Sequence, residues 1–410
     1  MSKLNTYLII NAGSSSLKFC LYRMPEKELM VKGKIEKIGE EESLWKIEDN
    51  EKTISKGNYH IHDHKNAINL MVGQLEDHKF VTSVNDITAI GHRILHGGEK
   101  YSDSVLIDKN VVNDIKKMTN LGPLHHPAAL KCINELNKYF RETPMVAVFD
   151  TAFHQTIDKE HYMYPIPYEW YSEYGIRKYG FHGTNYKYIT NIMKKNLNKE
   201  DVNLIICHIG SGSSICCVKN GKSFNTTMGL TPLAGLMMGT RSGDIDPAIV
   251  SFVNENMKKS QTEIMDDLNI RSGFLGISGK NDFRDVEELS KNGDENASLA
   301  IEMFKNSITK FIAEYYMELE GNVDAIVFTA GIGENAKTVR KKVIDKISPI
   351  TGAIIDEEQN DLIAGFKEIK EGIISSKNSK IPVYVIPANE ELMIVEDTYN
   401  IVEKEKVLTR

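Results

Sequence analysis

Short runs of apolar residues alternate along the chain with longer stretches in which apolar residues recur at every third or fourth position. The short runs predict β-strands at residues 7–10, 17–22, 87–90, 145–149, 204–207, 214–218, 325–328 and 381–386. The spaced apolar residues predict helices over 130–140 and 297–320. Thr184 is placed to cap a third helix that continues through Met193. Strands that alternate with helices along the whole chain indicate an α/β fold.

Two strand–turn–strand segments of the chain resemble each other. Residues 8–20 are LIINAGSSSLKFC, and residues 205–217 are IICHIGSGSSICC. Each combines an apolar strand, a turn of small residues and a second strand, and the two lie nearly half a chain apart. Such a repeat predicts two related domains that face each other, with two unrelated hairpins as the alternative. Asn220-Gly221, just after the second segment, predicts a tight hairpin turn.

Composition and charge exclude several classes of protein. The chain has 410 residues, 41% of them apolar and 26% charged, which is typical of a globular protein with two or three domains. The 50 basic residues are outnumbered by 57 acidic ones, so nothing indicates binding to nucleic acid. The apolar runs are far shorter than the roughly 20 residues of a membrane span. We therefore expect neither nucleic acid nor a membrane as a partner.

The five cysteines contain no CxxC pair, and three of them lie in apolar strand-like runs. This pattern predicts neither a disulfide framework nor a zinc site. No apolar leader segment precedes the first predicted strand, so we expect no secretory signal. Together these features favour a cytoplasmic protein.

The repeated turns are candidates for binding phosphate. Small residues at 11–18, NAGSSSLK, would let backbone N–H groups and hydroxyls approach a phosphate closely, and Lys18 adds positive charge. The turn is not a Walker A loop, because the GxxxxGK[ST] spacing is absent and a strand follows it. A single such turn is more often only a turn, but its second copy at 208–214 favours paired phosphate loops. Residues 331–336, GIGENA, follow a strand and precede a helix expected at Lys337, so we predict a loop against a nucleotide.

Four further residues carry candidate chemistry. Arg93 and Arg241 lie in glycine-rich loops, where a guanidinium can capture carboxylate or phosphoryl oxygens, and a surface arginine is the alternative for each. Asp150 ends a predicted strand, where it would organise a metal or simply cap a helix. His182 lies in a turn bracketed by glycines, although a lone histidine is usually structural. No zinc-type histidine spacing is present, so a bound metal would be a hard ion with oxygen ligands.

Seven motifs taken together resemble the acetate kinase family, within the superfamily of acetate and sugar kinases, Hsp70 and actin. They are NAGSSSLK at 11–18, GHRILHGGE at 91–99, FDTAFHQT at 149–156, YGFHGT at 179–184, GTRSGDIDPA at 239–248, FTAGIGEN at 328–335 and ANEELMI at 388–394. The resemblance runs from Tyr7 to about Thr398, which is essentially the whole chain.

The resemblance implies two duplicated actin-like (ribonuclease H-like) α/β domains with an active-site cleft between them. The first would span residues 1–150 and be completed by residues 391–410, and the second would span 151–390. The implied activity is reversible, Mg²⁺-dependent, direct in-line phosphoryl transfer between ATP and acetate, giving acetyl phosphate and ADP. Mn²⁺ is expected to substitute for Mg²⁺, and the family implies a homodimer.

Roles for individual residues also come from the resemblance. It implies that Mg²⁺ is held by Asn11 and Glu390. It assigns catalysis to Asp150, His182, Arg241 and Arg93. It places acetate against Arg93, Leu95, Leu124, Phe181 and Pro232. It places ATP and its phosphates against Ser14, Ser16, Lys18, His208, Ile209, Gly210, Ser211, Gly212, Asp282, Phe283, Arg284, Gly331, Ile332, Gly333, Glu334 and Asn335.

The chain departs from the family pattern at Ser211, His126, Ala234 and Asn185-Tyr186, and none of these changes removes a charged catalytic group. Ser211 stands where asparagine is usual, and its shorter side chain bears on nucleotide affinity and on the choice of phosphoryl donor. A propionate or butyrate kinase, or a pyrophosphate-using relative, would share most of the motifs. An actin- or Hsp70-like ATP-driven binding module would share the fold but would leave both arginines without an anionic acceptor.

Overall fold

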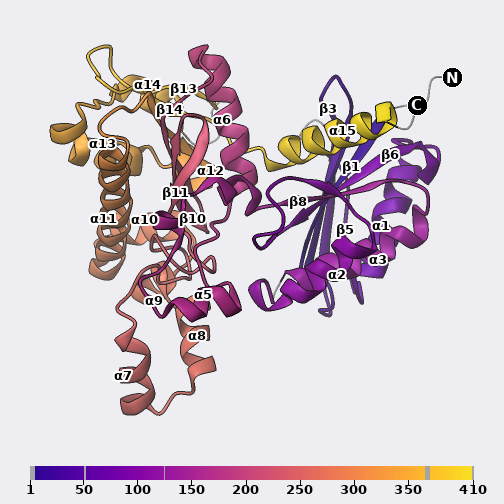
Figure 1. Ribbon diagram of the computed structural model, residues 1–410, viewed down its shortest axis with the longest axis horizontal. Helices are drawn as coiled ribbons and strands as arrows, with labels where there is room; N and C mark the ends of the chain where they lie inside the picture. Colours follow the sequence, from indigo (N-terminus) through magenta and orange to yellow (C-terminus); the bar gives the residue numbers. More distant parts are fainter. Residues whose placement is uncertain (1–4, 50–51, 124, 365–369, 409–410) are drawn as a thin grey trace. The chain divides into compact units, whose positions relative to one another are not determined.

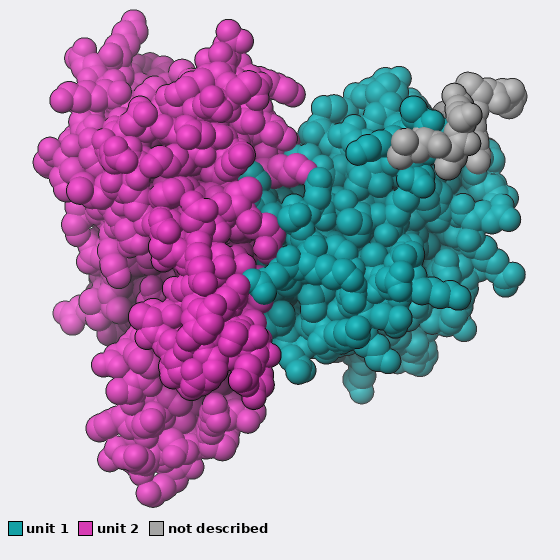
Figure 2. Space-filling model, viewed as in Figure 1, with its two compact units in different colours: residues 1–153, 183–185, 389–410 teal, residues 154–182, 186–388 magenta. Residues whose placement is uncertain are grey.

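The computed structural model describes residues 5–49, 52–123, 125–364 and 370–408. It divides the chain into two compact units, which Figure 2 shows in different colours. Unit 1 comprises residues 1–153, 183–185 and 389–410, and unit 2 comprises residues 154–182 and 186–388. Each unit has a β-sheet of its own with helices packed on it (Figure 1).

In the described part of unit 1, eight strands form a sheet with the order β5-β4-β3-β2-β1-β6-β8-β7. Their bounds are β1 Thr6–Gly13, β2 Ser16–Arg23, β3 Glu28–Glu36, β4 Ser43–Asp49, β5 Lys52–Tyr59, β6 Ile87–Ile94, β7 Val105–Leu106 and β8 Met145–Phe149. Strands β1, β6 and β8 run parallel, and the other neighbours are antiparallel. The carboxyl ends of the three parallel strands therefore meet at one edge of the sheet.

Both faces of this sheet are covered, which explains why β1 is apolar along most of its length. Leu8 and Ile10 belong to the core on one face, with residues of α1, α2 and α3. Tyr7 and Ile9, which point to the other face, pack with residues of α15. The helices are α1 His64–Asp77, α2 Lys109–Lys117, α3 His126–Tyr139 and α15 Glu390–Leu408, and the short 3₁₀ helices are η1 Val84–Asp86, η2 Met118–Leu121 and η3 Ala152–Thr156.

In the described part of unit 2, six strands form a sheet with the order β11-β10-β9-β12-β14-β13. Their bounds are β9 Leu204–Ile209, β10 Ser213–Lys219, β11 Lys222–Thr226, β12 Ala325–Thr329, β13 Gly372–Ile373 and β14 Val383–Val385. Strands β9, β12 and β14 run parallel, and β9, β10 and β11 are antiparallel neighbours. The order and directions match β3-β2-β1-β6-β8 of unit 1, which confirms the repeat predicted from the two segments.

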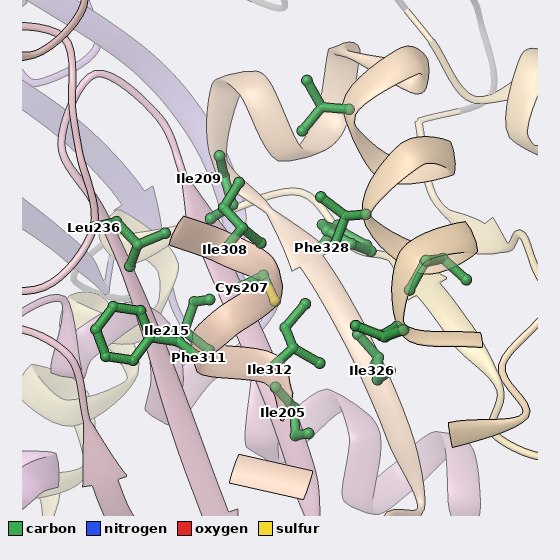
Figure 3. Packing of buried hydrophobic residues seen from close by; sticks show 14 of the residues in the cluster. Ile205, Cys207, Ile209, Ile215, Leu236, Ile308, Phe311, Ile312, Ile326 and Phe328 are labelled. Atoms are coloured by element: carbon green, nitrogen blue, oxygen red, sulfur yellow. The ribbon is translucent and has the colours of Figure 1, made fainter. Parts of the chain in front are cut away.

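The core of unit 2 lies between its sheet and a layer of helices. Ile205, Cys207 and Ile209 of β9 point toward Ile308 and Ile312 of α11 (Figure 3). Asp294 begins α11, since its side chain accepts the N–H of Ala297 at 2.7 Å. The helices are α4 Lys159–Tyr162, α5 Tyr168–Tyr174, α6 Gly183–Leu197, α7 Ala248–Met257, α8 Gln261–Ile270, α9 Gly273–Ser278, α10 Phe283–Lys291, α11 Glu295–Glu318, α12 Ala330–Asn335, α13 Lys337–Thr351 and α14 Glu357–Leu362.

Most predicted elements are confirmed, and three local predictions were wrong. Arg93 lies within β6 rather than in a loop after it, and residues 330–335 form the helix α12 rather than a loop. The Asn220-Gly221 turn joins β10 to β11, and both of its residues have positive φ. Thr184 does not cap α6, because the helix begins at Gly183 and the N-cap position is occupied by His182, with a φ of 57°. The five cysteines, all within the described ranges, are free and buried. Among the described helices, none is long and apolar enough to cross a membrane.

Candidate active site

The carboxyl ends of the parallel strands in unit 1 bring three predicted residues together. Asn11 lies near the end of β1, Arg93 near the end of β6, and Asp150 directly after β8. The Arg93 Nε atom is 3.3 Å from Asp150 Oδ1, and Arg93 Nη2 also donates to Asp150 Oδ2. Arg93 Nη1 lies 3.5 Å from Asn11 Oδ1. This edge is where α/β proteins commonly bind ligands.

Asp150 is fully buried, and both its side chain and its backbone are held by hydrogen bonds. Its Oδ1 atom also accepts the Thr184 hydroxyl at 3.0 Å, and its carbonyl accepts the Gly183 N–H at 2.8 Å. A Cβ added at Gly183 would lie only 2.3 Å from that carbonyl oxygen, so only glycine allows this close approach. The hydroxyl of Thr184, the second residue of α6, therefore binds Asp150.

A second carboxylate approaches the same guanidinium. Glu390, the first residue of α15, places Oε2 3.5 Å from Arg93 Nε. Burial raises the pKa of Glu390 to about 7, and the positive charge of Arg93 only partly opposes this rise. Burial lowers the pKa of Arg93, but Asp150 and Glu390 outweigh this effect, so its pKa lies above the usual value. Asn11 and Glu390 thus each place an oxygen near the Arg93 guanidinium.

The turn between β1 and β2 presents the predicted phosphate-binding residues of unit 1. Asn11 and Lys18 are register partners on the two strands, so their side chains lie on the same face of the sheet. Ser14 and Lys18 are exposed, and Ser16 is half-buried. The turn thus combines an exposed hydroxyl and an ammonium group beside Asn11.

In unit 2, His182 and Arg241 both lie beside the turn between β9 and β10. A Cβ added at Gly212 would lie 3.5 Å from Arg241 Nη1 and 3.8 Å from His182 Nε2. The His182 ring stacks on His208 with centroids 3.9 Å apart, and its Nδ1 atom is 2.9 Å from the Ser214 hydroxyl. That bond and the stack fix the ring, so Nε2 is the nitrogen nearest Gly212 and Arg241.

Arg241 differs from Arg93 in its partners. Its Nη1 atom donates to the Pro232 carbonyl at 3.1 Å and to Met238 Sδ at 3.6 Å. No carboxylate of the described residues forms an ion pair with it, and burial lowers its pKa. A partly buried guanidinium that has no anionic partner is well suited to bind an anionic ligand.

The predicted nucleotide loops meet around one cavity in unit 2. The cavity has a volume of about 630 Å³, which suits a small ligand. All three predicted loops contribute to its lining, which comprises Gly210, Ser211, Gly239, Phe274, Asn281, Asp282, Phe283, Arg284, Glu287, Gly331, Ile332, Asn335 and Ala336. At its rim, Arg284 donates to both oxygens of Asp282 at 3.0 and 2.6 Å. These hydrogen bonds lower the pKa of Asp282 to about 2.

Some predicted nucleotide residues do not line this cavity. Ile209 is buried in the core of unit 2. His208 lies beneath His182, and Gly333 is buried within α12. Glu334 turns its carboxylate toward the backbone N–H of Ala388, at 2.9 Å. These four residues support the cavity wall rather than face its space.

The predicted acetate contacts are divided between the units. Leu95 directly follows β6, is half-buried, and is absent from the core clusters that contain Ile94. Pro232 adjoins Arg241 through its carbonyl, and Phe181 is fully buried beside His182 in the chain. Leu124 lies outside the described residues.

Sequence reasoning missed several residues that the structure links to these sites. Thr184 binds Asp150, Ser214 binds His182, Phe274 lines the cavity, and Arg340 holds α12. The motif YGFHGT contains Thr184 and the repeated segment contains Ser214, so both were visible without their partners. Nothing local marks Phe274 or Arg340, because their roles depend on helices that pack from distant parts of the chain.

Comparison with known proteins gives a consistent result. The model of the acetokinase family matches residues 6–396. The acetate kinase of Carboxydothermus hydrogenoformans is 47% identical over 401 residues, covering 96% of this chain and 98% of that protein. The acetate kinase of Clostridium novyi is 46% identical over 405 residues, covering 98% and 99% of the two chains.

Solved structures agree with this result. The acetate kinase of Porphyromonas gingivalis has a TM-score of 0.90 and 38% identity, covering 97% of this chain and all of that one. A propionate kinase from Francisella tularensis has the same TM-score and coverage with 42% identity. The fold is thus the mixed α/β fold of acetate kinase structures, with two sheets. On these grounds, the chain belongs to the acetokinase family.

Proposed function

We propose that the chain is an acetate kinase, which transfers the terminal phosphoryl group of Mg-ATP to acetate and forms acetyl phosphate and ADP. The observation that carries this proposal is Arg241. It is a partly buried cation with no carboxylate partner among the described residues, held beside His182 at a glycine turn. A cavity of about 630 Å³ in the same unit supports nucleotide binding. The full-length similarity to acetate kinases supports the choice of substrate.

The chemistry of the reaction explains why cations are needed. Acetate is ionised at neutral pH, so its attack on phosphorus requires no general base. The difficulty is to bring two anions together and to stabilise a loose in-line transition state whose charge is spread over the phosphoryl oxygens. Arg93, Arg241, His182 and Lys18 would supply that positive charge. We propose that Arg93 receives the acetate carboxylate and that Arg241 and His182 contact the transferred group.

Acetate is already ionised, so Asp150 is not needed as a general base to remove a proton from it. Its carboxylate instead accepts hydrogen bonds from Arg93 and Thr184, which supports a role in fixing the direction of the guanidinium. A carboxylate that holds an arginine in a rigid fork also limits the entropy lost when substrate binds. Our expectation that Asp150 orients the metal or its waters stays a prediction.

Asn11 and Glu390 fit a Mg²⁺ site. Both present a hard oxygen near the Arg93 guanidinium: Asn11 Oδ1 lies 3.5 Å from Nη1, and Glu390 Oε2 lies 3.5 Å from Nε. Within the described ranges, no group of three or more His, Cys, Asp and Glu residues is placed to hold a metal ion. Proteins often bind Mg²⁺ through one or two carboxylates together with substrate phosphates, and one carboxylate with one amide oxygen fits that pattern. When bound, the ion would neutralise phosphate charge; Mn²⁺ is the expected substitute.

Two further properties belong to the proposal. We propose that the chain acts as a homodimer and in the cytoplasm, as its resemblance to the family implies. A propionate kinase is the second candidate, favoured by the structure of the Francisella tularensis enzyme. Leu95 favours acetate, because it is large for a position that would contact the acyl methyl group.

Trapping the product with hydroxylamine tests the proposal. Hydroxylamine converts an acyl phosphate to a coloured hydroxamate complex, so formate, acetate, propionate and butyrate can be compared with ATP, GTP or pyrophosphate as donor. We expect acetate with ATP to give the highest kcat/KM among these pairs. ATP hydrolysis at the same rate with and without each acceptor would instead indicate an ATP-driven binding module and would overturn the proposal.

A further inference from the structure

Arg340 is a fully buried arginine outside the predicted site. It lies on α13 and has no measurable exposure, and it is the largest fully buried side chain in the described structure. No carboxylate of the described residues forms an ion pair with it. Burial lowers the pKa of Arg340 to about 10, while Asp361 opposes this change only weakly. Burying a cation without an anion is costly, so its hydrogen bonds must offset that cost.

Every hydrogen bond that the structure gives Arg340 ends on an uncharged oxygen. Nη1 donates to the carbonyls of Gly333 and Glu334 at 2.9 and 2.7 Å. Nε donates to Asn360 Oδ1 at 2.8 Å, and Nη2 donates to the carbonyls of Asn360 and Ile363. The rigid guanidinium fork thus ties three segments together: α12, α14 and the residue that follows α14.

The contacts to α12 follow from helix chemistry. The last carbonyls of a helix have no partner within it, and α12 is only six residues long. Gly333 and Glu334 lie at its carboxyl end, where the partial negative charge of the carbonyls favours a cation. Arg340 supplies that cation from the first turn of the next helix. Ala330, at the start of α12, has a φ of 65°, which is strained for alanine and needs support from its surroundings.

The same short helix contacts two parts of the proposed machinery. Gly331, Ile332 and Asn335 line the nucleotide cavity. Glu334 accepts the N–H of Ala388 at 2.9 Å, and burial raises the pKa of this carboxyl group. Ala388 lies two residues before Glu390, which is the proposed metal ligand. A shift of α12 would therefore move one wall of the cavity and loosen the start of the segment that carries Glu390.

We propose that Arg340 is a positioning residue that fixes α12 against the nucleotide and, through Glu334, fixes the segment that leads to Glu390. It touches neither substrate nor metal. The proposal rests on the proposed use of the cavity for ATP, but not on the identity of the phosphoryl acceptor.

The variant Arg340→Lys keeps the charge and removes the fork, so at most three of the five contacts can remain. We expect weaker ATP binding by calorimetry, by at least about tenfold, because charged hydrogen bonds to α12 are lost. kcat/KM for ATP should fall by about 10²-fold, the scale of a small misplacement in a site. The KM for acetate should change by less than about twofold, because Arg340 touches none of the residues proposed to bind acetate.

Ile347→Ala is the matched control, because Ile347 is buried on the same helix two turns further on and its apolar side chain makes no hydrogen bond to α12. It should lower the melting temperature while leaving the Kd for ATP unchanged. Asn360→Ala removes a partner of Arg340 and should weaken ATP binding in the same direction if Arg340→Lys does not fold. The proposal is overturned if Arg340→Lys and Asn360→Ala both bind ATP with the same Kd as Ile347→Ala.

A second pair of variants tests the link through Glu334. Glu334→Gln keeps an oxygen that can accept the Ala388 N–H, whereas Glu334→Ala removes it. We expect Glu334→Ala to raise the Mg²⁺ concentration needed for half-maximal ATP binding and Glu334→Gln to restore it, and equal values for both contradict the link. Since ATP binding is measured without acetate, a wild-type protein that binds ATP but forms no acetyl phosphate refutes the proposed function alone.

Discussion

Arg93 and Arg241 place the same side chain in two different electrostatic environments. Arg93 is held by Asp150 and approached by Glu390, whereas among the described residues the Arg241 guanidinium donates to the Pro232 carbonyl and the Met238 sulfur and has no carboxylate partner. The first is fixed in direction by its carboxylates before any ligand arrives. The second carries a positive charge that only a ligand anion can balance. This difference leads to different consequences when each arginine is removed.

Arg93→Ala and Arg241→Ala should each lower kcat/KM by about 10²–10³-fold, because each removes a cation that faces the developing negative charge. Their stabilities should differ. Arg93→Ala leaves the buried Asp150 carboxylate unpaired, which costs about 3–5 kcal/mol in the free energy of unfolding, whereas Arg241→Ala leaves no such charge. Urea unfolding measures this difference.

The double variant Arg93→Ala with Asp150→Asn is the control for that prediction. Replacing the carboxylate should recover much of the lost stability without recovering activity. Near-normal turnover in either single variant, with an unchanged circular dichroism spectrum, would show that the arginine does not neutralise the phosphoryl group.

Leu95 sets a testable limit on the acyl acceptor. It is half-buried and lies outside the core clusters, and we propose that it contacts the acyl group. Adding a methylene to a filled site costs about 1–3 kcal/mol, so acetate should be preferred to propionate by about tenfold or more in kcat/KM. Leu95→Ala should shift the ratio toward propionate. A wild-type preference for propionate or butyrate would contradict the small-pocket interpretation.

Among the secondary-structure elements, those with both faces buried were the most predictable. β1, β6, β8, β9 and β12 appear in the sequence as apolar runs because helices cover both faces of the sheet at these positions. The strands at the far side of the unit 1 sheet, from residue 28 to 59, were not predicted. In these strands, charged residues interrupt the alternation of buried and exposed positions. The strands therefore depend on pairing with their neighbours rather than on a clear apolar pattern.

The candidate site was predictable where a motif carries the residue, and not where packing creates its role. The motifs identified Arg93, Asp150 and Arg241, but not the hydrogen bonds of Asp150 to Thr184 or of Arg241 to the Pro232 carbonyl. The bond of Thr184 to Asp150 joins positions 34 residues apart, and the bonds of Arg340 reach forward to Asn360 and Ile363. Only the folded arrangement of helices and strands defines such contacts.

The long helix α11 carries a carboxylate that predicts a pH effect on stability. Glu318 Oε1 accepts from Asn225 at 2.7 Å, and Oε2 is buried with no hydrogen-bond partner among the described residues. Burial raises the pKa of Glu318 above its usual value, although His161 and Lys178 nearby oppose this rise. The folded state therefore binds this proton more tightly than the unfolded state, and stability falls as pH rises from the unfolded toward the folded pKa.

Glu318→Gln removes that titration and keeps an acceptor for Asn225. Its melting temperature relative to the wild type should therefore rise as the pH is raised above about 4.3, the usual pKa of a glutamate. Differential scanning calorimetry at several pH values measures this, with Glu320→Gln as an exposed control. A difference that stays constant with pH would mean that Glu318 is not penalised by burial.

For the whole molecule, the candidate residues are divided between two units of the same topology. Unit 1 carries Asn11, Arg93 and Glu390, while unit 2 carries His182 and Arg241 with the nucleotide cavity. The two units thus carry different sets of candidate charges, although their sheets share one topology. The metal site assigned to unit 1 makes a simple prediction for the complete enzyme.

Removal of divalent cations should abolish acetyl phosphate formation, because the ion proposed to bind Asn11 and Glu390 would no longer neutralise the phosphates. Turnover with ATP and acetate is measured after dialysis against EDTA and again after addition of Mg²⁺ or Mn²⁺. Restoration by either ion is the expected result. Full activity in EDTA would contradict the assignment of this pair as metal ligands.

The central claim is that the two arginines neutralise a phosphoryl group as it passes between ATP and acetate. Phosphorus NMR tests it most directly, because the γ-phosphate signal of ATP and the acetyl phosphate signal are followed in one sample with Mg²⁺. With the wild-type chain, we predict that acetate makes the second signal grow as the first declines, and that acetyl phosphate with ADP gives the reverse change. The Arg241→Ala chain should slow both directions by about 10²–10³-fold. ATP loss that yields only inorganic phosphate, or equal rates in the variant, would contradict the account.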